Sequence, residues 1–125
     1  MIFFRADENL NALFITISGL QTRDKLSEQL PILIQTCDKL KDGFFIITDL
    51  SMLEVKDDKD YVIFNQVSKK IMDTFKIAHA IRIYGTKSVH KTKLEKIDQK
   101  LNFSHVHYAK SKNEALKIAG ALKEK

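Results

Sequence analysis

The chain is poor in the residues that interrupt or cross-link a fold. Its 125 residues include one proline, one cysteine, four glycines and no tryptophan. So few glycines and prolines exclude a collagen-like or low-complexity protein and leave little room for long flexible linkers. The lone cysteine, Cys37, has no second cysteine with which to form an internal disulfide. This pattern is typical of a protein in a reducing compartment.

Long apolar runs are also missing. No stretch approaches the roughly 18 apolar residues that cross a bilayer, so we expect no membrane insertion. The N-terminus has no basic segment followed by a longer apolar one, so we expect no signal peptide and a cytoplasmic protein. The length, with 44% hydrophobic and 30% charged residues, is typical of one globular domain spanning residues 1–125.

Arginine is absent from the last third of the chain, although that third is strongly basic. Residues 85–125 carry 10 lysines and 4 acidic residues, whereas residues 1–84 carry 11 basic and 12 acidic residues. A basic segment can bind an acidic partner or nucleic acid. Without arginine, and with few aromatic residues for base stacking, solvated lysine-rich helices explain the charge better than a nucleic-acid site.

The hydrophobic pattern predicts alternating strands and helices. Alternating or continuous short apolar runs predict strands over residues 2–5, 13–18, 44–51, 78–84 and 103–108. Apolar spacings of three and four predict helices over residues 22–41 and 58–75, and from Thr92 and Ser111 onward, where capping boxes begin. We expect Pro31 to kink or break the first helix, because a proline inside a helix removes a hydrogen bond.

This order, strand-strand-helix-strand-helix-strand-helix-strand-helix, predicts an α/β fold. We expect a four- to five-stranded mixed, mainly parallel sheet with about four helices. The run Phe44–Ser51 reads as a strand buried on both faces. Ligands and partners of such sheets meet the chain just beyond the carboxyl ends of the strands, so the junction over residues 49–60 is the first place to look for function.

Several of these segments together resemble a STAS domain, the module of sulphate transporters and bacterial anti-sigma-factor antagonists. The resemblance covers nearly the whole chain. It depends on the opening hairpin, the strand that ends Asp49-Leu50-Ser51, the helix after the following loop, the strand Ile81–Gly85 and the closing helix with Ser111 and Glu114. It implies a STAS-like fold, a non-enzymatic regulatory role, and binding of proteins or small ligands.

The chain departs from this family at one functional motif. Signalling members carry Asp-Ser-Ser-Gly-Leu where the loop enters the second helix, and one of these serines is phosphorylated. The corresponding stretch here is Asp57-Asp58-Lys59-Asp60-Tyr61, which has no serine and no glycine. The resemblance therefore does not carry over the phosphorylation switch. The acids could imitate a phosphorylated state, but a solvated acidic helix start is the simpler interpretation.

Two surfaces are candidate binding sites. For a protein partner or a second copy of the chain we predict a surface made of Asp49, Ser51, Asp57, Asp58, Lys59, Asp60 and Tyr61. The alternative is a module that binds a small anionic or lipid-like molecule, because the stretch after the fourth strand combines hydroxyls and lysines before a helix start. Its candidate anion-binding residues are Thr86, Lys87, Ser88 and Lys91.

No residue pattern predicts a catalytic site, a metal or a cofactor. The four histidines, His79, His90, His105 and His107, raise the possibility of a metal site. His105 and His107 would lie on one face of a strand roughly 7 Å apart, but no Cys or acid is adjacent in the sequence to add a ligand, so ordinary histidines are favoured over a zinc site. Cys37 lies on the apolar stripe of the first helix and is interpreted as a packed core thiol. Asp49 and Ser51 lack a nearby histidine that would complete a nucleophilic site.

Overall fold

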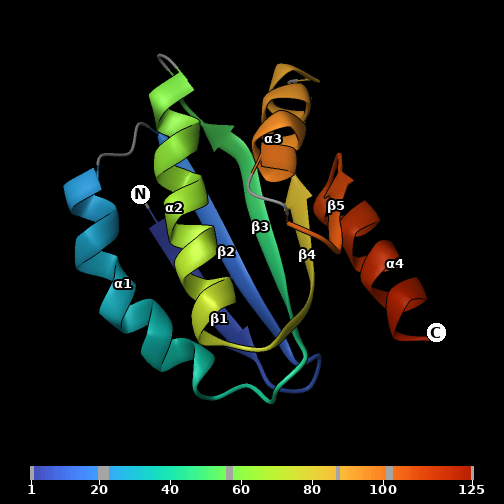
Figure 1. Cartoon of the computed structure of the whole chain (residues 1–125). Coiled ribbons are helices and arrows are strands. Elements are labelled where there is room, and N and C mark those ends of the chain that lie inside the picture. The colour runs from blue at the N-terminus through green and yellow to red at the C-terminus, as the bar shows by residue number, and fades with distance from the viewer. Residues whose placement is uncertain (1, 20–22, 56–57, 87, 101–102, 125) are drawn as a thin grey trace.

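The chain folds as an α/β protein with a five-stranded sheet and four helices (Figure 1). The computed structural model describes residues 2–19, 23–55, 58–86, 88–100 and 103–124. The strands are β1 (Ile2–Asp7), β2 (Ala12–Gly19), β3 (Phe44–Leu53), β4 (Ile77–Ile83) and β5 (Val106–Ala109). The helices are α1 (Arg23–Cys37), α2 (Asp58–Thr74), α3 (Ser88–Lys100) and α4 (Lys112–Lys123). The predicted order of elements is confirmed.

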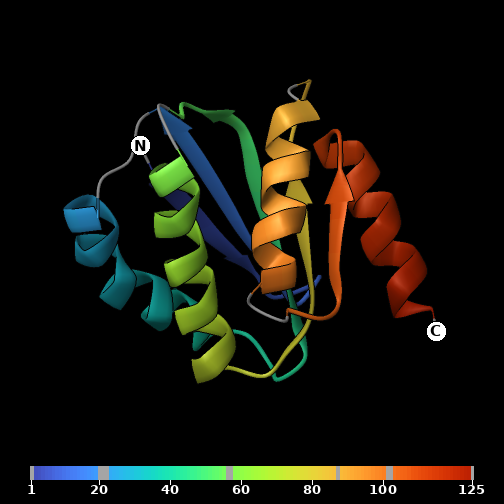
Figure 2. The same cartoon turned by 45° about the horizontal axis from the view of Figure 1, so that its top comes forward.

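The five strands lie side by side in chain order. β1 pairs antiparallel with β2, and β2 to β5 pair parallel, which confirms the mixed, mainly parallel sheet. Helices α1, α2 and α3 connect successive parallel strands and cover one face, as crossovers of a single hand require (Figures 1 and 2). In the described residues, no helix combines the length and the hydrophobicity needed to span a bilayer.

Strand β3 divides the interior into two cores. Phe44 and Ile46 pack into the cluster beneath α1, α2 and α3, whereas Phe45 and Ile47 pack into the cluster beneath α4. All four are buried, so the prediction of a strand buried on both faces is confirmed. Among the described residues, α4 is the one helix on the second face, and it lies toward the β5 side of the sheet (Figure 2).

Two predicted boundaries near the carboxyl ends of the strands were wrong. β3 continues to Leu53, because Met52 and Leu53 pair with the end of β2 after a register shift, so Asp49 and Ser51 lie inside the strand. Helix α3 begins at Ser88, and Thr92 lies within it instead of opening it.

Two further predictions need correction. Helix α1 continues through Pro31 as one helix, so the predicted break is wrong, while the alternative of a kink stays a prediction; the helix ends at Cys37 instead of at residue 41. The proline is exposed, while Leu33 and Cys37 hold the second half of the helix on the sheet. The last strand begins at Val106, so His105 precedes it with a φ of 61°.

Candidate binding site

Asp49 and Ser51 form a local brace within β3. One carboxylate oxygen, Asp49 Oδ1, accepts hydrogen bonds from the Ser51 N–H at 2.9 Å and from the Ser51 hydroxyl at 2.6 Å. Gly85 packs against this brace with a φ of +70°, and a Cβ placed on it would lie 2.7 Å from Ser51 Cβ. The serine hydroxyl is thus held by its neighbour, which favours a structural role for the pair.

The rest of the predicted partner surface is only partly described. Tyr61 is 3% exposed and belongs to the core, so its side chain does not lie on the surface that the prediction assigned to it. Lys59 is exposed in the first turn of α2. Asp57 and the side chains of Asp58 and Asp60 lie outside the described part of the chain, so the acidic surface stays a prediction.

The predicted anion-binding stretch is mostly helical. Thr86 is exposed in the turn before α3, and Lys91 lies in the first turn of that helix. The Lys91 ammonium is 3.7 Å from Glu95 Oε1 and 5.9 Å from the centroid of the Tyr84 ring. Lys91 therefore already interacts with an acidic and an aromatic side chain of this chain. Lys87 and the side chain of Ser88 lie outside the described residues, and this site too stays a prediction.

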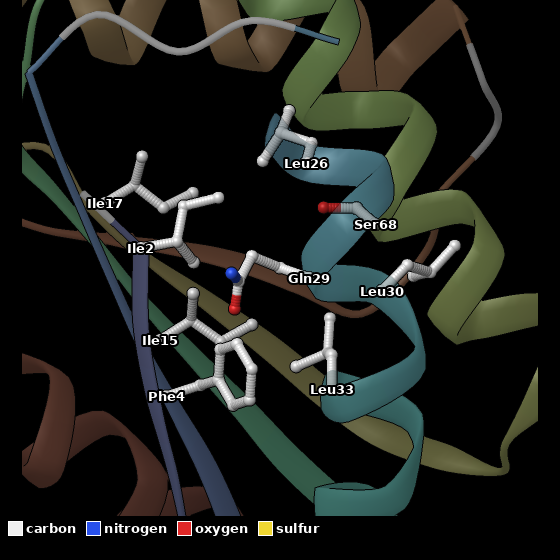
Figure 3. A pocket seen from close by; sticks show the side chains of 9 residues that line it. All are labelled: Ile2, Phe4, Ile15, Ile17, Leu26, Gln29, Leu30, Leu33 and Ser68. Carbon is white, nitrogen blue, oxygen red and sulfur yellow. The ribbon is translucent and has the colours of Figure 1, made fainter. Parts of the chain in front are cut away.

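A narrow cavity lies between the sheet and helices α1 and α2 (Figure 3). It is lined by apolar side chains from both layers, with Gln29 and Ser68 as its polar members. Its volume is about 20 Å³. One buried water needs roughly this much space, so the cavity is too small for a lipid-like ligand.

Three histidines gather at the amino ends of β4 and β5. His79 Nδ1 lies 3.0 Å from His107 Nε2, and the His79 and His105 ring centroids are 5.2 Å apart. Beside them is a hollow of about 340 Å³, which Lys69 and Asp73 of α2 also line. Among the described residues, no three His, Cys, Asp or Glu side chains are placed to hold a metal ion.

The sequence suggested the four histidines as a possible metal group, but it did not place His79 beside His105 and His107, because these residues belong to different strands or to the loop between them. His105 and His107 were expected to share one strand face, but β4 supplies the imidazole, His79, that lies against both rings. The 28 residues between His79 and His107 hide the contact from any local pattern. A histidine inside an otherwise apolar strand was the one available signal.

An open surface borders α4, over the part of the sheet that this helix leaves uncovered. It contains two hollows of about 160 and 270 Å³, which share Ile47 and therefore adjoin. We call this surface the α4 groove; the residues used to define it are Phe3, Arg5, Leu10, Phe14, Lys112, Leu116, Gly120 and Lys123. Its apolar members are unusually accessible: Phe3 is 64%, Leu10 42% and Leu116 37% exposed.

Three cations lie over aromatic rings in the α4 groove. Arg5 Cζ is 4.9 Å and Lys112 Nζ is 5.4 Å from the centroid of the Phe14 ring. Lys123 Nζ is 5.2 Å from the Phe45 ring and also donates a hydrogen bond to the Leu10 carbonyl. These distances are in the range of cation–π attraction. The larger hollow is apolar apart from Lys123, whereas the smaller one also contains Thr16 and Asp49, and basic side chains lie at both ends of the groove.

The α4 groove was not predicted from the sequence. Its residues come from the two ends of the chain, β1 and β2 on one side and α4 on the other, and only the folded sheet brings them together. No family model matches the chain, and no curated protein matches it. Function is therefore inferred from the groove and from the resemblance described above.

Proposed function

We propose that the chain is a STAS-like protein-interaction domain with a regulatory role, acting without enzymatic chemistry and without a serine phosphorylation switch. The order of its strands and helices, with an opening hairpin followed by alternating elements, is the order that such a domain requires. This agreement supports the family resemblance, and the surface of the molecule supports the mode of action.

The α4 groove carries the proposal. Phe3, Leu10 and Leu116 are three of the large apolar side chains that remain exposed in the described residues, and all three line this one surface. Single exposed apolar residues are ordinary, but a continuous apolar surface with a polar rim is typical of a protein-binding site.

The buried reactive groups support a non-enzymatic role. Burial, followed by the negative charge of Asp38, raises the pKa of the Cys37 thiol to about 12, so the nucleophilic thiolate is strongly disfavoured. Arg82 and Asp98 are paired with each other inside the protein, and Asp49 is engaged by Ser51. These groups stabilise the fold and are not presented to a substrate.

Site-specific photo-crosslinking in cells of the source organism tests the proposed function. Benzoylphenylalanine would replace Leu116 in the α4 groove, Lys59 of the predicted acidic surface, or Ile32, an exposed apolar control on α1. We expect protein adducts at Leu116 that the Ile32 variant does not form. Adducts at Lys59 alone would support the interaction function but move it to the acidic surface. A lack of protein adducts at all three positions would overturn the proposed function.

A small-molecule function is the second candidate. The observation that favours it is the hollow lined by His79 and His105. Its volume of about 340 Å³ lies within the range of 300–1,000 Å³ found for ligand pockets. His79 and His105 would supply hydrogen bonds to an anionic ligand, whereas Lys69 is paired with Asp73 at 2.6 Å. Native mass spectrometry of the purified chain would then show a bound molecule that is lost in His79→Ala and kept in Lys117→Ala. A spectrum of the bare chain alone would exclude this candidate.

A further inference from the structure

We propose that the α4 groove receives an amphipathic helix with acidic side chains, supplied by another protein. This inference rests on the proposed interaction function and names the chemistry of the partner. The incoming helix would lie beside α4, over β1 and β2, where no helix of the described residues covers the second face of the sheet (Figures 1 and 2).

The shape of the groove favours a helix over a small molecule. Its two hollows, of about 160 and 270 Å³, are each smaller than a typical ligand pocket. They adjoin along one side of α4, so a rod about 10 Å wide would contact both, as a helix does. On the opposite face of the sheet, helices α1, α2 and α3 already pack on the strands in this way. Helix-in-groove binding is a common mode of peptide recognition.

The side of α4 that borders the groove has the pattern of a helix interface. Lys112, Leu116, Gly120 and Lys123 follow one another at spacings of four, four and three residues, which places them along one side of the helix. The distance from Lys112 to Lys123 along the axis is about 16 Å at 1.5 Å per residue. The stripe therefore offers about three turns of contact, with a cation at each end.

The packing within this chain does not explain why residue 120 is a glycine. A glycine inside a helix costs about 1 kcal/mol relative to alanine. A Cβ built on Gly120 would meet nothing within 4 Å, so an alanine would fit. The glycine leaves the wall of the groove flat at this point. Close approach of another backbone is one of the reasons for which proteins place glycine at a surface.

The charges of the groove select an acidic partner. Arg5 and Lys112 lie at one end and Lys123 at the other, all on the exposed rim. Arg5 is already paired with Asp7 at 3.4 Å, and the Asp49 carboxylate lines the smaller hollow, so Lys112 and Lys123 are the charges that would attract acidic side chains. A partner helix with acids near both ends of its apolar stripe would complement this rim, which raises specificity and association rate.

A displayed peptide library tests the inference directly. Each peptide would be a helix of about 18 residues, or five turns, with a leucine stripe and rim positions randomised among glutamate, lysine and serine. The library would be selected on the wild-type chain, on the double variant Lys112→Glu/Lys123→Glu, and on Lys117→Glu, a matched control on α4 outside the stripe. We expect the wild type and the control to enrich glutamate at both ends, and the double variant to enrich lysine.

Two groove variants then locate the contact. Leu116→Asp places a charge on the side of α4 that borders the groove, and Gly120→Gln fills the open space while improving helix propensity. Each should weaken binding of a selected peptide at least tenfold, with the circular dichroism spectrum unchanged.

Three results would overturn the inference: enrichment that ignores charge, enrichment that is the same in the double variant, or binding of a selected peptide to both groove variants that is as tight as to the wild type. Leu116-dependent binding to phosphatidylglycerol vesicles without peptide enrichment would instead assign the groove to lipid. If no peptide is enriched but protein adducts still form in the crosslinking experiment, the proposal of an acidic helical partner is rejected. The proposed interaction function is then retained.

Discussion

Arg82 of β4 and Asp98 of α3 form a bidentate ion pair inside the protein. Arg82 Nε donates to Asp98 Oδ2 at 2.9 Å, and Nη2 donates to Oδ1 at 2.8 Å. The two residues are only 1% and 3% exposed, and the Tyr108 hydroxyl of β5 donates a further hydrogen bond to Asp98. The pair therefore ties α3 to two neighbouring strands at once.

Removing one partner of this pair should be strongly destabilising. Asp98→Asn leaves the Arg82 guanidinium buried without its counter-charge, and we expect the free energy of unfolding to fall by about 3–5 kcal/mol. Urea denaturation measures the change. The triple variant Arg82→Met/Asp98→Leu/Tyr108→Phe removes the charges together with the third donor, and it should recover most of the loss. A single variant within about 1 kcal/mol of wild type would contradict this account.

Much of this architecture was readable from the sequence, because its signals are local. The alternating and continuous apolar runs fixed which segments are strands, and the capping box at Ser111 predicted the start of α4, where the Glu114 N–H donates to Ser111 Oγ at 3.2 Å. β3 was predicted as buried on both faces because Phe44 through Ile47 are all apolar. Each of these features depends on residues a few positions apart.

The features that were misjudged depend on distant partners. β3 extends past Asp49 because the end of β2 is there to pair with it. The α4 groove joins residues about a hundred positions apart in the chain. Neither periodicity nor capping patterns contain this information.

Cys37 should be inert in the folded protein. Burial and the charge of Asp38 raise its pKa from about 9 to about 12, so little thiolate forms near neutrality. We expect alkylation by iodoacetamide at pH 8 to be at least a hundredfold slower in the native protein than in urea, as followed by mass spectrometry. Equal rates under both conditions would show that the thiol is accessible.

The same shift predicts a loss of stability in alkali. A group whose folded pKa is raised contributes stability that is present below the unfolded pKa and lost as pH rises through the folded value. For Cys37 this window runs from about pH 9 to about pH 12. The advantage in free energy of unfolding of the wild type over Cys37→Ala, measured in urea, should shrink across this range. A constant difference would contradict the assignment to this thiol.

Two glycines should respond in opposite ways to replacement by alanine. Gly85 has a φ of +70°, and its added Cβ would lie 2.7 Å from Ser51 Cβ and 3.2 Å from Ser51 Cα. A left-handed conformation alone costs an L-residue about 1–2 kcal/mol, so Gly85→Ala should lower the melting temperature clearly. Gly120→Ala should raise it, by up to about 1 kcal/mol in stability, because the helix gains propensity and the space is open. Calorimetry of both variants measures the two melting temperatures. Equal shifts in melting temperature would contradict the geometry described for the two glycines.

The acidic stretch at the start of α2 and the α4 groove are competing partner surfaces, and a pair of variants separates them. Charge reversal of Asp57, Asp58 and Asp60 to lysine should abolish partner binding if the sequence-based prediction is right. Leu116→Asp should abolish it if the groove is the site, because a carboxylate on the side of α4 that borders the groove would be buried by the partner at a cost of several kcal/mol. Crosslinked partners recovered with each variant decide between them. The groove predicts that the charge-reversed chain keeps its partners and that the Leu116 variant loses them; the reverse result would return the interaction to the acidic surface.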